Sequence, residues 1–430
     1  MINLIQTYKR VHKNFICIAM VSITFAFSAR AYNIQIHIQG LSNVKIMLAE
    51  FYGNSYFVID TTRLDTEGIG RFENKTNISE GIYYIVLPNK NSIEFLLSSN
   101  EELIIQTDTQ HPFNNLQIKG SQESSAYIHY QQFLAEQFGL MKNLSTEMKQ
   151  SQKDLNAVYR IMKEISAIQK NIEERKSEII QNYPDWIFSE YLKMTLDPVK
   201  NSSKTSMPFQ EKYEAYFREY NFSSISVVRT PFFPEGVIHF VNRYATDNHE
   251  IRQMARLIID SGIPKQVKGI IFEILHDYFK SLEQQITGEQ SLVYMSNELV
   301  KNDFLEVSFN PLMIMRLQKT FPGNVIPKEI YNQINPEVPT VLAFWNPECA
   351  ACKKDEKRIS TLDMPVHIVF LNSGESIDLQ ESQRLNAIEL QINHQTLSDF
   401  PINHTPVYFL LNDKGIIIQK TYHLGDILND

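Results

Sequence analysis

Cysteine, glycine and proline are all scarce in this chain. Its 430 residues include three cysteines, 15 glycines and 17 prolines. So few cysteines exclude a small disulfide-dense scaffold, and so little glycine and proline exclude a collagen-like or low-complexity chain. The rest of the composition, 43% hydrophobic and 21% charged, is that of an ordinary globular protein. The length allows about two to four domains, each large enough to bury a core.

Acidic residues are absent from residues 1–31, which contain four basic ones. An apolar run over residues 15–27 follows the basic stretch, and Ala29-Arg30-Ala31 supplies the small-x-small pattern of a signal peptidase site. We therefore predict a secretory signal over residues 1–31, a mature start at Tyr32 and a location in the periplasm or cell envelope. The alternative is an uncleaved anchor helix, although the run is shorter than the ~20 residues that cross a bilayer.

Positive charge is in the minority once this segment is set aside. Removing its four basic residues from 41 leaves 37, against 49 acidic residues and a net charge of −12. This balance disfavours nucleic acid as a partner, because its phosphate backbone is bound by lysine and arginine. No later stretch approaches 18 uninterrupted apolar residues, so we expect no direct membrane span after removal of the signal.

Three patterns follow one another along the mature chain. Residues 32–120 alternate with period two, as in Ile34 and Ile36, which predicts an antiparallel β-sandwich. Residues 121–325 place apolar side chains three and four apart, which predicts a domain of amphipathic α-helices. Residues 326–430 alternate strand and helix, which predicts an α/β domain with a thioredoxin-like fold. We therefore expect a multidomain chain with boundaries near 120 and 325.

Two aromatic-rich stretches lie in the helical region, at residues 186–188 and 230–233. They could line a peptide-binding groove, but packing between helices is the commoner use of such side chains. We therefore expect these side chains in the core.

Cys349 and Cys352 are the two cysteines that remain without the signal segment. A disulfide between them would close almost no loop and would constrain the unfolded chain only slightly, so chemistry explains the pair better than structure. They lie between an apolar strand at residues 338–345 and a charged helix. A thiol at a helix N-terminus has a lowered pKa and can attack a disulfide. We predict that Cys349 is the nucleophile and that Cys352, one turn inside the helix, is the resolving thiol.

Two stretches carry a resemblance to a known family. Residues 344–356, with Trp345 before the two cysteines, resemble the active-site stretch of TlpA/ResA-like thioredoxin-fold thiol-disulfide oxidoreductases. Residues 400–411, with Thr405-Pro406 before an apolar strand, resemble the cis-proline loop of the same family. Residues 32–121 resemble an N-terminal β domain of unassigned function that often precedes thioredoxin-like domains in exported bacterial proteins.

The resemblance implies an exported enzyme that reduces disulfides in envelope proteins through a dithiol cycle. Its electrons would come from a membrane-linked donor, and it would need no cofactor and no metal. The resemblance also implies a cis peptide bond before Pro406 and substrate-binding positions at Trp345, Thr405 and Pro406. An extended substrate would pair with the exposed backbone of Thr405 as an added strand.

Several residues depart from the pattern of that family. Glu348 stands where an aromatic residue often precedes the nucleophile, and its charge would oppose thiolate formation. Ala351 replaces the proline common before the second cysteine, so the redox potential cannot be transferred. Ala343 replaces the buried acid of cytoplasmic thioredoxins, which removes the expected proton acceptor. His404, two residues before Pro406, is expected near the sulfurs as a second pKa modulator or proton carrier.

Other interpretations of the cysteine pair stay open. It could be a structural pair without redox activity, or part of a zinc site that draws on His394, His404 and His423. A second class of function is an envelope binding or scaffold protein whose thioredoxin-like domain is accessory or carries copper. Such a carrier would bind one Cu(I) per chain and would not reduce a peptide disulfide.

We predict that protein recovered from the cell envelope begins at Tyr32, because the basic, apolar and small-x-small segments occur in the order that signal peptidase requires. Intact-mass measurement or N-terminal sequencing of the envelope fraction checks this. Recovery of residues 1–31 on the membrane-bound protein would instead establish the uncleaved anchor.

Overall fold

The structure is a computed structural model with side chains. It describes residues 32–74, 78–98, 102–200, 207–282, 286–304, 311–334, 337–346, 349–360, 362, 364–370, 387–390, 392–402 and 404–427. The predicted signal segment and Glu348 therefore lie outside the described residues. The chain divides into two compact units. The first comprises residues 1–51 and 56–189, and the second comprises residues 52–55 and 190–430. The predicted boundaries near 120 and 325 stay a prediction.

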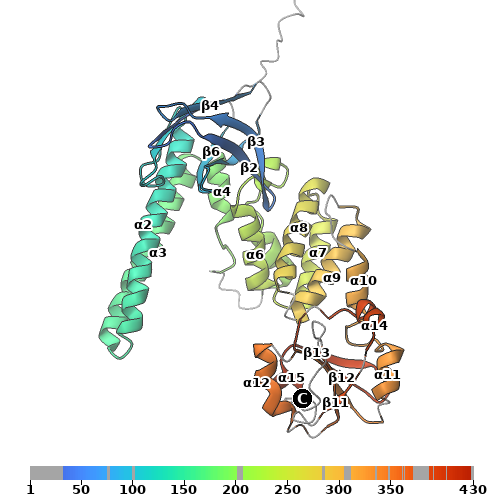
Figure 1. Cartoon of the computed structure of the whole chain (residues 1–430). Coiled ribbons are helices and arrows are strands. Elements are labelled where there is room, and N and C mark those ends of the chain that lie inside the picture. The colour runs from blue at the N-terminus through green and yellow to red at the C-terminus, as the bar shows by residue number, and fades with distance from the viewer. Residues whose placement is uncertain are drawn as a thin grey trace, which may run out of the picture. The chain divides into compact units, whose positions relative to one another are not determined.

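Two four-stranded sheets open the first unit, and their strands are drawn in blue to cyan in Figure 1. The first sheet has the order β4-β1-β7-β8, with bounds β4 (Ile69–Asn74), β1 (Tyr32–Gln39), β7 (Glu102–Asp108) and β8 (Gln117–Lys119). The second has the order β3-β2-β5-β6, with bounds β3 (Ser55–Arg63), β2 (Lys45–Tyr52), β5 (Gly81–Val86) and β6 (Ser92–Leu97). Along β1 every second side chain is buried, so the period-two prediction is confirmed there.

The prediction of an antiparallel sandwich is wrong for one central strand pair. β1 pairs with β4 in antiparallel fashion but with β7 in parallel fashion, with Ile34 opposite Leu103. Parallel neighbours need a long connection, and here the chain passes through β2–β6 before it returns as β7. An alternating pattern identifies the buried face of a strand but not the direction of its neighbour, so the sequence could not reveal this pairing.

A long helical hairpin completes most of the first unit. It consists of α2 (Gln122–Gln150) and α3 (Leu155–Asn182), which pack against each other. Each helix begins at a side-chain cap, since Ser121 accepts a hydrogen bond from the Ser124 N–H and Asp154 accepts from Ala157. Ile161 and Ile172 of α3 are buried and Ile165 and Ile168 between them are partly buried, so the predicted three- and four-residue spacing is confirmed over residues 161–172.

Helices make up the following stretch of the chain. Their bounds are α4 (Ile187–Met194), α5 (Phe209–Tyr216), the 3₁₀ turn η1 (Ile225–Val228), α6 (Phe232–Tyr244), α7 (Asn248–Asp260), α8 (Lys265–Ser281), α9 (Ile286–Lys301) and α10 (Pro311–Gln318). Phe188 and Phe233 are fully buried, so in both aromatic-rich stretches a phenylalanine packs in the core. Within the described residues no helix is long and apolar enough to cross a membrane.

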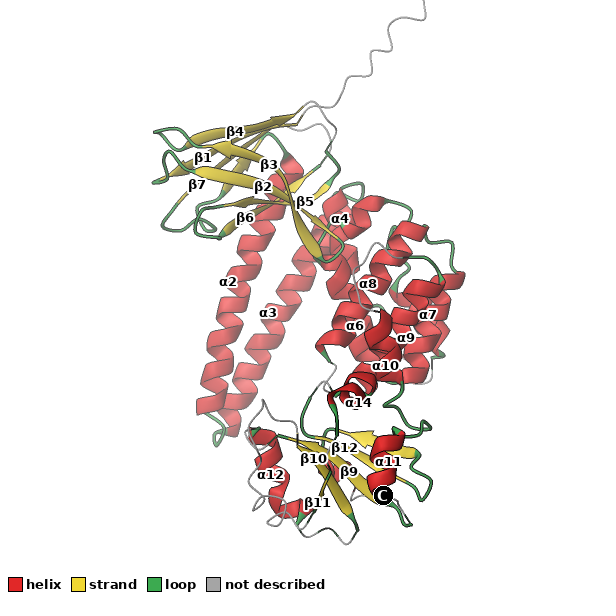
Figure 2. Ribbon diagram, turned by 45° about the vertical axis from the view of Figure 1, so that its right-hand side comes forward, coloured by secondary structure: helices red, strands yellow, loops and turns green. Residues whose placement is uncertain are grey.

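A five-stranded mixed sheet forms the end of the chain, with the order β11-β10-β9-β12-β13. Its elements are α11 (Lys328–Ile334), β9 (Thr340–Trp345), α12 (Ala350–Ile359), β10 (Val366–Phe370), β11 (Ile388–Glu389), α14 (His394–Asp399), β12 (Val407–Leu411), β13 (Ile417–Thr421) and α15 (Leu424–Ile427). β10 is parallel to β9, whereas β12 is antiparallel to β9. Figure 2 shows α11 and α12 against this sheet.

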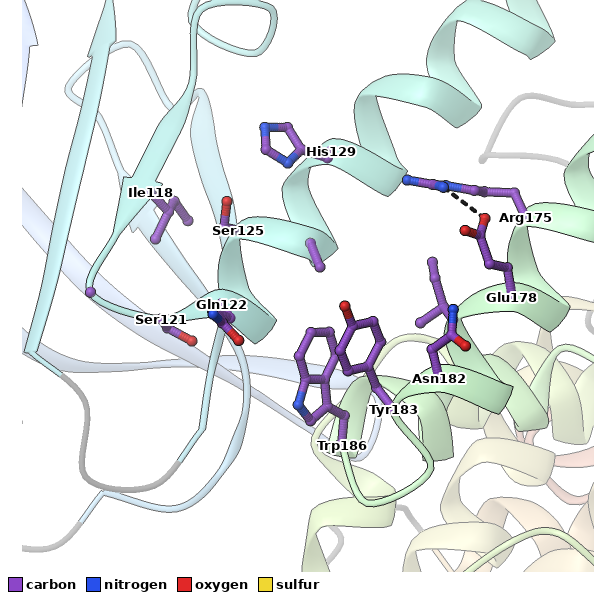
Figure 3. Close-up of a pocket in the computed structure, with 13 residues that line it drawn as sticks. Ile118, Ser121, Gln122, Ser125, His129, Arg175, Glu178, Asn182, Tyr183 and Trp186 are labelled. Carbon is purple, nitrogen blue, oxygen red and sulfur yellow. Dashed lines mark hydrogen bonds and ion pairs between the residues drawn. The ribbon is translucent and has the colours of Figure 1, made fainter.

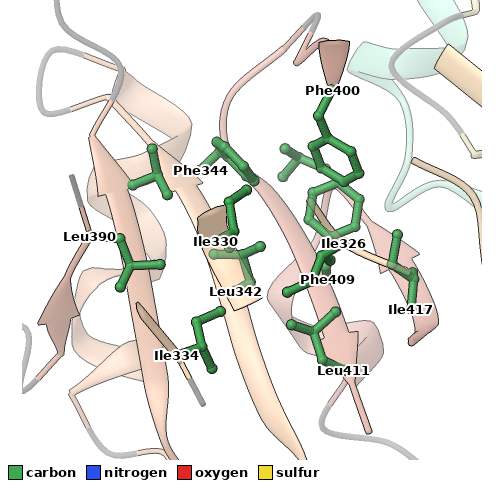
Figure 4. Close-up of a cluster of buried hydrophobic side chains, with 12 residues drawn as sticks. Ile326, Ile330, Ile334, Leu342, Phe344, Leu390, Phe400, Phe409, Leu411 and Ile417 are labelled. Carbon is green, nitrogen blue, oxygen red and sulfur yellow. The ribbon is translucent and has the colours of Figure 1, made fainter. Parts of the chain in front are cut away.

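Helices cover both faces of this sheet, and β9 contributes side chains to each layer. Leu342 and Phe344 face the layer that contains Ile330 of α11 and Phe400, which Figure 4 shows. The side chains of Val341, Ala343 and Trp345 face the opposite layer, where they pack with residues of α12 and α15. All six residues of β9 are buried, as expected for a central strand covered on both sides.

A buried ion pair joins the edge strand β13 to α9. The Lys420 ammonium lies 2.5 Å from a Glu289 carboxylate oxygen, and the two side chains are 2% and 0% exposed. Lys420 also donates to the Thr320 hydroxyl at 2.8 Å, and its ammonium lies within 5.8 Å of the centroids of three aromatic rings. Burial raises the pKa of Glu289 and lowers that of Lys420, while each partner offsets part of the other's shift.

We predict that Lys420→Met lowers the free energy of unfolding by about 3–5 kcal/mol, because it leaves the Glu289 carboxylate buried without its cation. Urea denaturation of the full chain measures this. The matched control is Lys265→Met, which breaks an ion pair to Asp303 with side chains 62% and 90% exposed and should cost under ~1 kcal/mol. The double variant Glu289→Leu/Lys420→Met should recover most of the loss, and equal losses in Lys420→Met and Lys265→Met would contradict the prediction.

Candidate active site

The two cysteines lie where β9 ends and α12 begins. Antiparallel pairing of β9 with β12 sets Val407 opposite Phe344, so the start of β12 lies at the end of β9. The loop before β12 therefore meets the start of α12 at one edge of the sheet. This register brings Cys349 and Thr405 together, although 56 positions separate them in the sequence.

Cys349 is the N-cap residue of α12. Its carbonyl accepts the first helical hydrogen bond, from the Lys353 N–H at 3.1 Å, and its sulfur accepts the Cys352 N–H at 3.3 Å. Burial raises the pKa of the Cys349 thiol, whereas hydrogen bonds from the Cys352 thiol and from the backbone N–H groups of Cys352 and Ala351 lower it. The net pKa lies below the ordinary thiol value, because these donors face the sulfur at the positive end of the helix.

Cys352 has the opposite environment. It is fully buried among the side chains of β9, β10 and α15, whereas Cys349 is only partly buried. Burial and the hydrogen bond to Cys349 raise the pKa of the Cys352 thiol to about 12. Both cysteines are free thiols in the structure. One thiol of the pair is therefore prepared to attack, and the other remains protonated.

The proline loop has the predicted cis geometry. The Thr405-Pro406 peptide bond is cis, and the Cys349 sulfur lies 3.3 Å from the Thr405 carbonyl oxygen. The backbone of Thr405 thus lies beside the Cys349 sulfur.

The other predicted site residues lie in different environments. Trp345 is 2% exposed in the layer under α12, so its ring supports the cysteine helix and offers little surface to a substrate. The His404 ring lies 6.2 Å from the Tyr422 ring, and His404 also lowers the pKa of Glu289. These contacts place His404 beside the buried ion pair. Ala343 is fully buried, as expected from its strand position.

An acidic side chain that the sequence analysis passed over lies near Cys352. Asp355 follows Cys352 by three residues on α12 and so shares its face. Its side chain is 14% exposed and accepts a hydrogen bond from the Tyr408 hydroxyl at 3.0 Å. Burial raises the pKa of Tyr408, and the charges of Asp355 and of both cysteines raise it further. The Cys-x-x-Asp spacing in the helix was the sequence pattern that could have identified Asp355.

The described residues contain no group of three or more histidine, cysteine, aspartate and glutamate side chains that could hold a metal ion. The predicted zinc and copper alternatives therefore gain no ligand cluster from this part of the chain.

Comparison with known proteins adds matches that each cover a part of the chain. Residues 32–127 match a family described as a domain of unknown function, DUF4369. No curated protein matches the chain. A thio-disulfide isomerase from Thermus thermophilus is 15% identical, with 21% of this chain and 75% of that chain covered and a TM-score of 0.19.

Two further solved structures are similar over a slightly larger share of the chain. The thioredoxin domain of a thiol-disulfide oxidoreductase from Bacteroides vulgatus is 16% identical, with 23% of this chain and 79% of that chain covered and a TM-score of 0.20. A thiol:disulfide interchange protein from a Bacteroides species is 15% identical, with 23% and 72% covered and a TM-score of 0.20. Independently of these matches, the C-terminal sheet has a thioredoxin-like strand order, a CxxC at the start of a helix and a cis proline.

We predict that iodoacetamide at neutral pH labels Cys349 at least about ten times faster than Cys352, because only the thiolate reacts and the two pKa values are shifted in opposite directions. The Cys349 rate should rise with pH to a plateau whose midpoint lies below that of a free thiol. Peptide mass spectrometry after timed quenching measures both sites, and the same chain unfolded in urea is the control that should label both equally. Faster labelling of Cys352 would reverse the proposed roles.

Proposed function

We propose that this protein is an exported thiol-disulfide oxidoreductase that reduces disulfides in envelope proteins. The observation that carries the proposal is the contrast between the two thiols. Cys349 is partly exposed with a lowered pKa, and Cys352 is buried with a pKa raised to about 12. A structural disulfide needs no such difference, whereas an attacking and a resolving thiol do.

The reaction begins with attack by the Cys349 thiolate on a substrate disulfide. A bond forms between the Cys349 sulfur and one substrate sulfur, the substrate S–S bond breaks, and the departing thiolate takes a proton from water. The Cys352 thiol then loses its proton and attacks the Cys349 sulfur. The second substrate thiolate leaves and is protonated, so the substrate gains two electrons and two protons while Cys349 and Cys352 become a disulfide.

The second step needs a base, because a thiol with a pKa of about 12 is protonated at neutral pH. Asp355 supplies a carboxylate one turn along α12, held by the Tyr408 hydroxyl. Tyr408, which holds Asp355, packs in the same buried cluster as Cys352, and this supports a role for Asp355 next to the resolving thiol. We assign Asp355 as the acceptor of the Cys352 proton. It would replace the buried strand acid of cytoplasmic thioredoxins, whose position in this chain is occupied by Ala343.

Substrate binding and location form the remaining parts of the proposal. An extended substrate segment would lie along the Thr405 backbone beside the Cys349 sulfur, and the cis proline Pro406 follows Thr405 directly in the chain. The pattern of residues 1–31 supports the proposed export. Regeneration of the dithiol requires a two-electron donor, which we expect to be membrane-linked.

We predict that Cys352→Ser traps a substrate as a persistent mixed disulfide on Cys349, because the thiol that would release it is gone. Asp355→Asn should accumulate the same adduct more weakly, since resolution is slowed and not abolished. The chain should carry Cys17→Ser, so that the pair contains its only cysteines. Non-reducing gels and mass spectrometry of envelope extracts, with insulin reduction as the turnover assay, measure both effects.

Cys349→Ser is the matched control, and it should neither trap a partner nor reduce insulin. Asp355→Glu should restore turnover that Asp355→Asn loses, which a merely structural role of the acid would not require. A Cys352→Ser protein that traps nothing, together with an inactive parent chain, would reject the oxidoreductase. Tight binding of one Cu(I) by that inactive chain would favour the copper-carrying alternative.

A further inference from the structure

A pocket of about 560 Å³ lies in the first unit, between the start of α2 and the end of α3. Figure 3 shows side chains from both helices and from the following turn around it. Its size falls within the range of ~300–1,000 Å³ that is usual for small-molecule sites. It involves none of the residues assigned to the thiol chemistry, so its ligand is a separate question.

A rigid pair of aromatic rings forms one wall. Tyr183 and Trp186 stack with 3.8 Å between ring centroids and 9° between ring planes. The turn between them explains the stack, because Pro184 is its second residue and the Trp186 N–H donates to the Tyr183 carbonyl at 3.2 Å. The Ser189 hydroxyl donates to the same carbonyl at 2.6 Å and closes the turn. The platform is thus built before any ligand arrives.

The aromatic pair is accessible, although Trp186 belongs to a stretch, residues 186–188, that was expected in the core. Tyr183 is 44% exposed and Trp186 is partly buried, whereas Phe188 two residues later is fully buried. An indole and a phenol combine an apolar face with a polar N–H or O–H at the edge. A ligand stacked here would need apolar C–H groups on one face and hydrogen-bonding groups at its rim.

The rest of the lining is mostly polar, includes the His129 imidazole, and also contains the apolar side chains of Ile118, Ala126 and Ile179. Arg175 and Glu178 both line the pocket and form an ion pair at 2.8 Å, drawn as a dashed line in Figure 3. Gln122 and Asn182 add two side-chain amides, and Ser125 adds a hydroxyl. Amides and hydroxyls both donate and accept hydrogen bonds, so the wall suits a ligand whose groups do the same.

These features select among classes of ligand. An anion would have to compete with Glu178 for Arg175, and a cation would have to compete with Arg175 for Glu178. An apolar ligand would leave the amide and hydroxyl groups of the lining without hydrogen-bond partners. We propose that the pocket binds a neutral saccharide, whose C–H face stacks on an outer ring face of the Tyr183–Trp186 pair while its hydroxyl groups bond to Gln122 and Asn182.

A peptide is the alternative class, because the pocket borders the edge strand β8. β8 has only three residues, so an added strand would gain few backbone hydrogen bonds from it. The aromatic platform and the amides are independent of that edge. The observations therefore favour the saccharide.

Tryptophan fluorescence gives a direct test, because the chain has two tryptophans and Trp345 is only 2% exposed. Cellobiose, maltose, lactose and N,N′-diacetylchitobiose are titrated into the full chain, with calorimetry as the second readout. We expect at least one disaccharide to give a saturable change and to protect Trp186 from acrylamide quenching. Insulin reduction, measured in parallel, should be unchanged by the sugar.

Variants then locate the site. Trp186→Ala should weaken association about tenfold or more, and Asn182→Ala and Gln122→Ala, both at exposed positions, should each weaken it about threefold. The matched control is Tyr159→Ala, which removes a 73% exposed aromatic on α3 outside the pocket and should leave binding unchanged. Circular dichroism verifies that each variant is folded.

Three outcomes would overturn the proposal. The first is the absence of saturable binding by all four disaccharides at millimolar concentration. The second is binding that survives in Asn182→Ala, Gln122→Ala and Trp186→Ala alike. The third is saturation by an unstructured alanine-serine hexapeptide and by none of the sugars, which would make the pocket a peptide site.

Discussion

The register between β9 and β12 is the constraint on which the proposed active site depends. Because Val407 pairs with Phe344 in antiparallel fashion, the first residues of β12 lie next to the last residues of β9, at the same end of the sheet. The cysteine helix starts at that end, and the proline loop stops there. A shift of one residue would reverse the faces of β12 and move Tyr408 out of the layer that contains Cys352.

The pKa values of two thiols three residues apart are shifted in opposite directions because the helix gives them different surroundings. The cap position leaves Cys349 partly exposed and surrounds its sulfur with backbone donors. The next turn points Cys352 into the packed layer beneath α12, where desolvation disfavours the thiolate. In the proposed reaction, the burial that keeps Cys352 protonated creates the need for an internal base, and Asp355 lies on the same face of the helix as Cys352.

The sequence predicts this region well wherever the physics is local. The alternation of strands with helices, the CxxC at a strand-to-helix junction and the Thr-Pro before a hairpin each depend on residues close together in the chain. The structure has all three. Contacts between distant segments were harder. Ala343 drew attention to a missing strand acid, whereas Asp355 acquires its place through Tyr408, which arrives 53 residues later in the chain.

The same limit explains what was missed in the first unit. Period two gives the buried face of β1 but not the direction of β7, so the parallel pair could not be foreseen. The aromatic side chains at residues 186–188 differ in burial for a related reason. Phe188 belongs to the helix face that packs inward, while Trp186 stands in the preceding turn and stacks on Tyr183 instead.

The buried ion pair between Glu289 and Lys420 sets a condition on the C-terminal sheet. β13 is an edge strand, and an edge with unpaired backbone groups invites association with other chains. Here the chain before α11 covers part of it, since Gly323 and Asn324 exchange backbone hydrogen bonds with Ile417. Lys420 then needs Glu289 and Thr320 to neutralise and satisfy its buried ammonium. A fragment cut after Thr320 would lose the Glu289 carboxylate and leave that ammonium uncompensated, so the thioredoxin-like sheet depends on α9 for part of its stability.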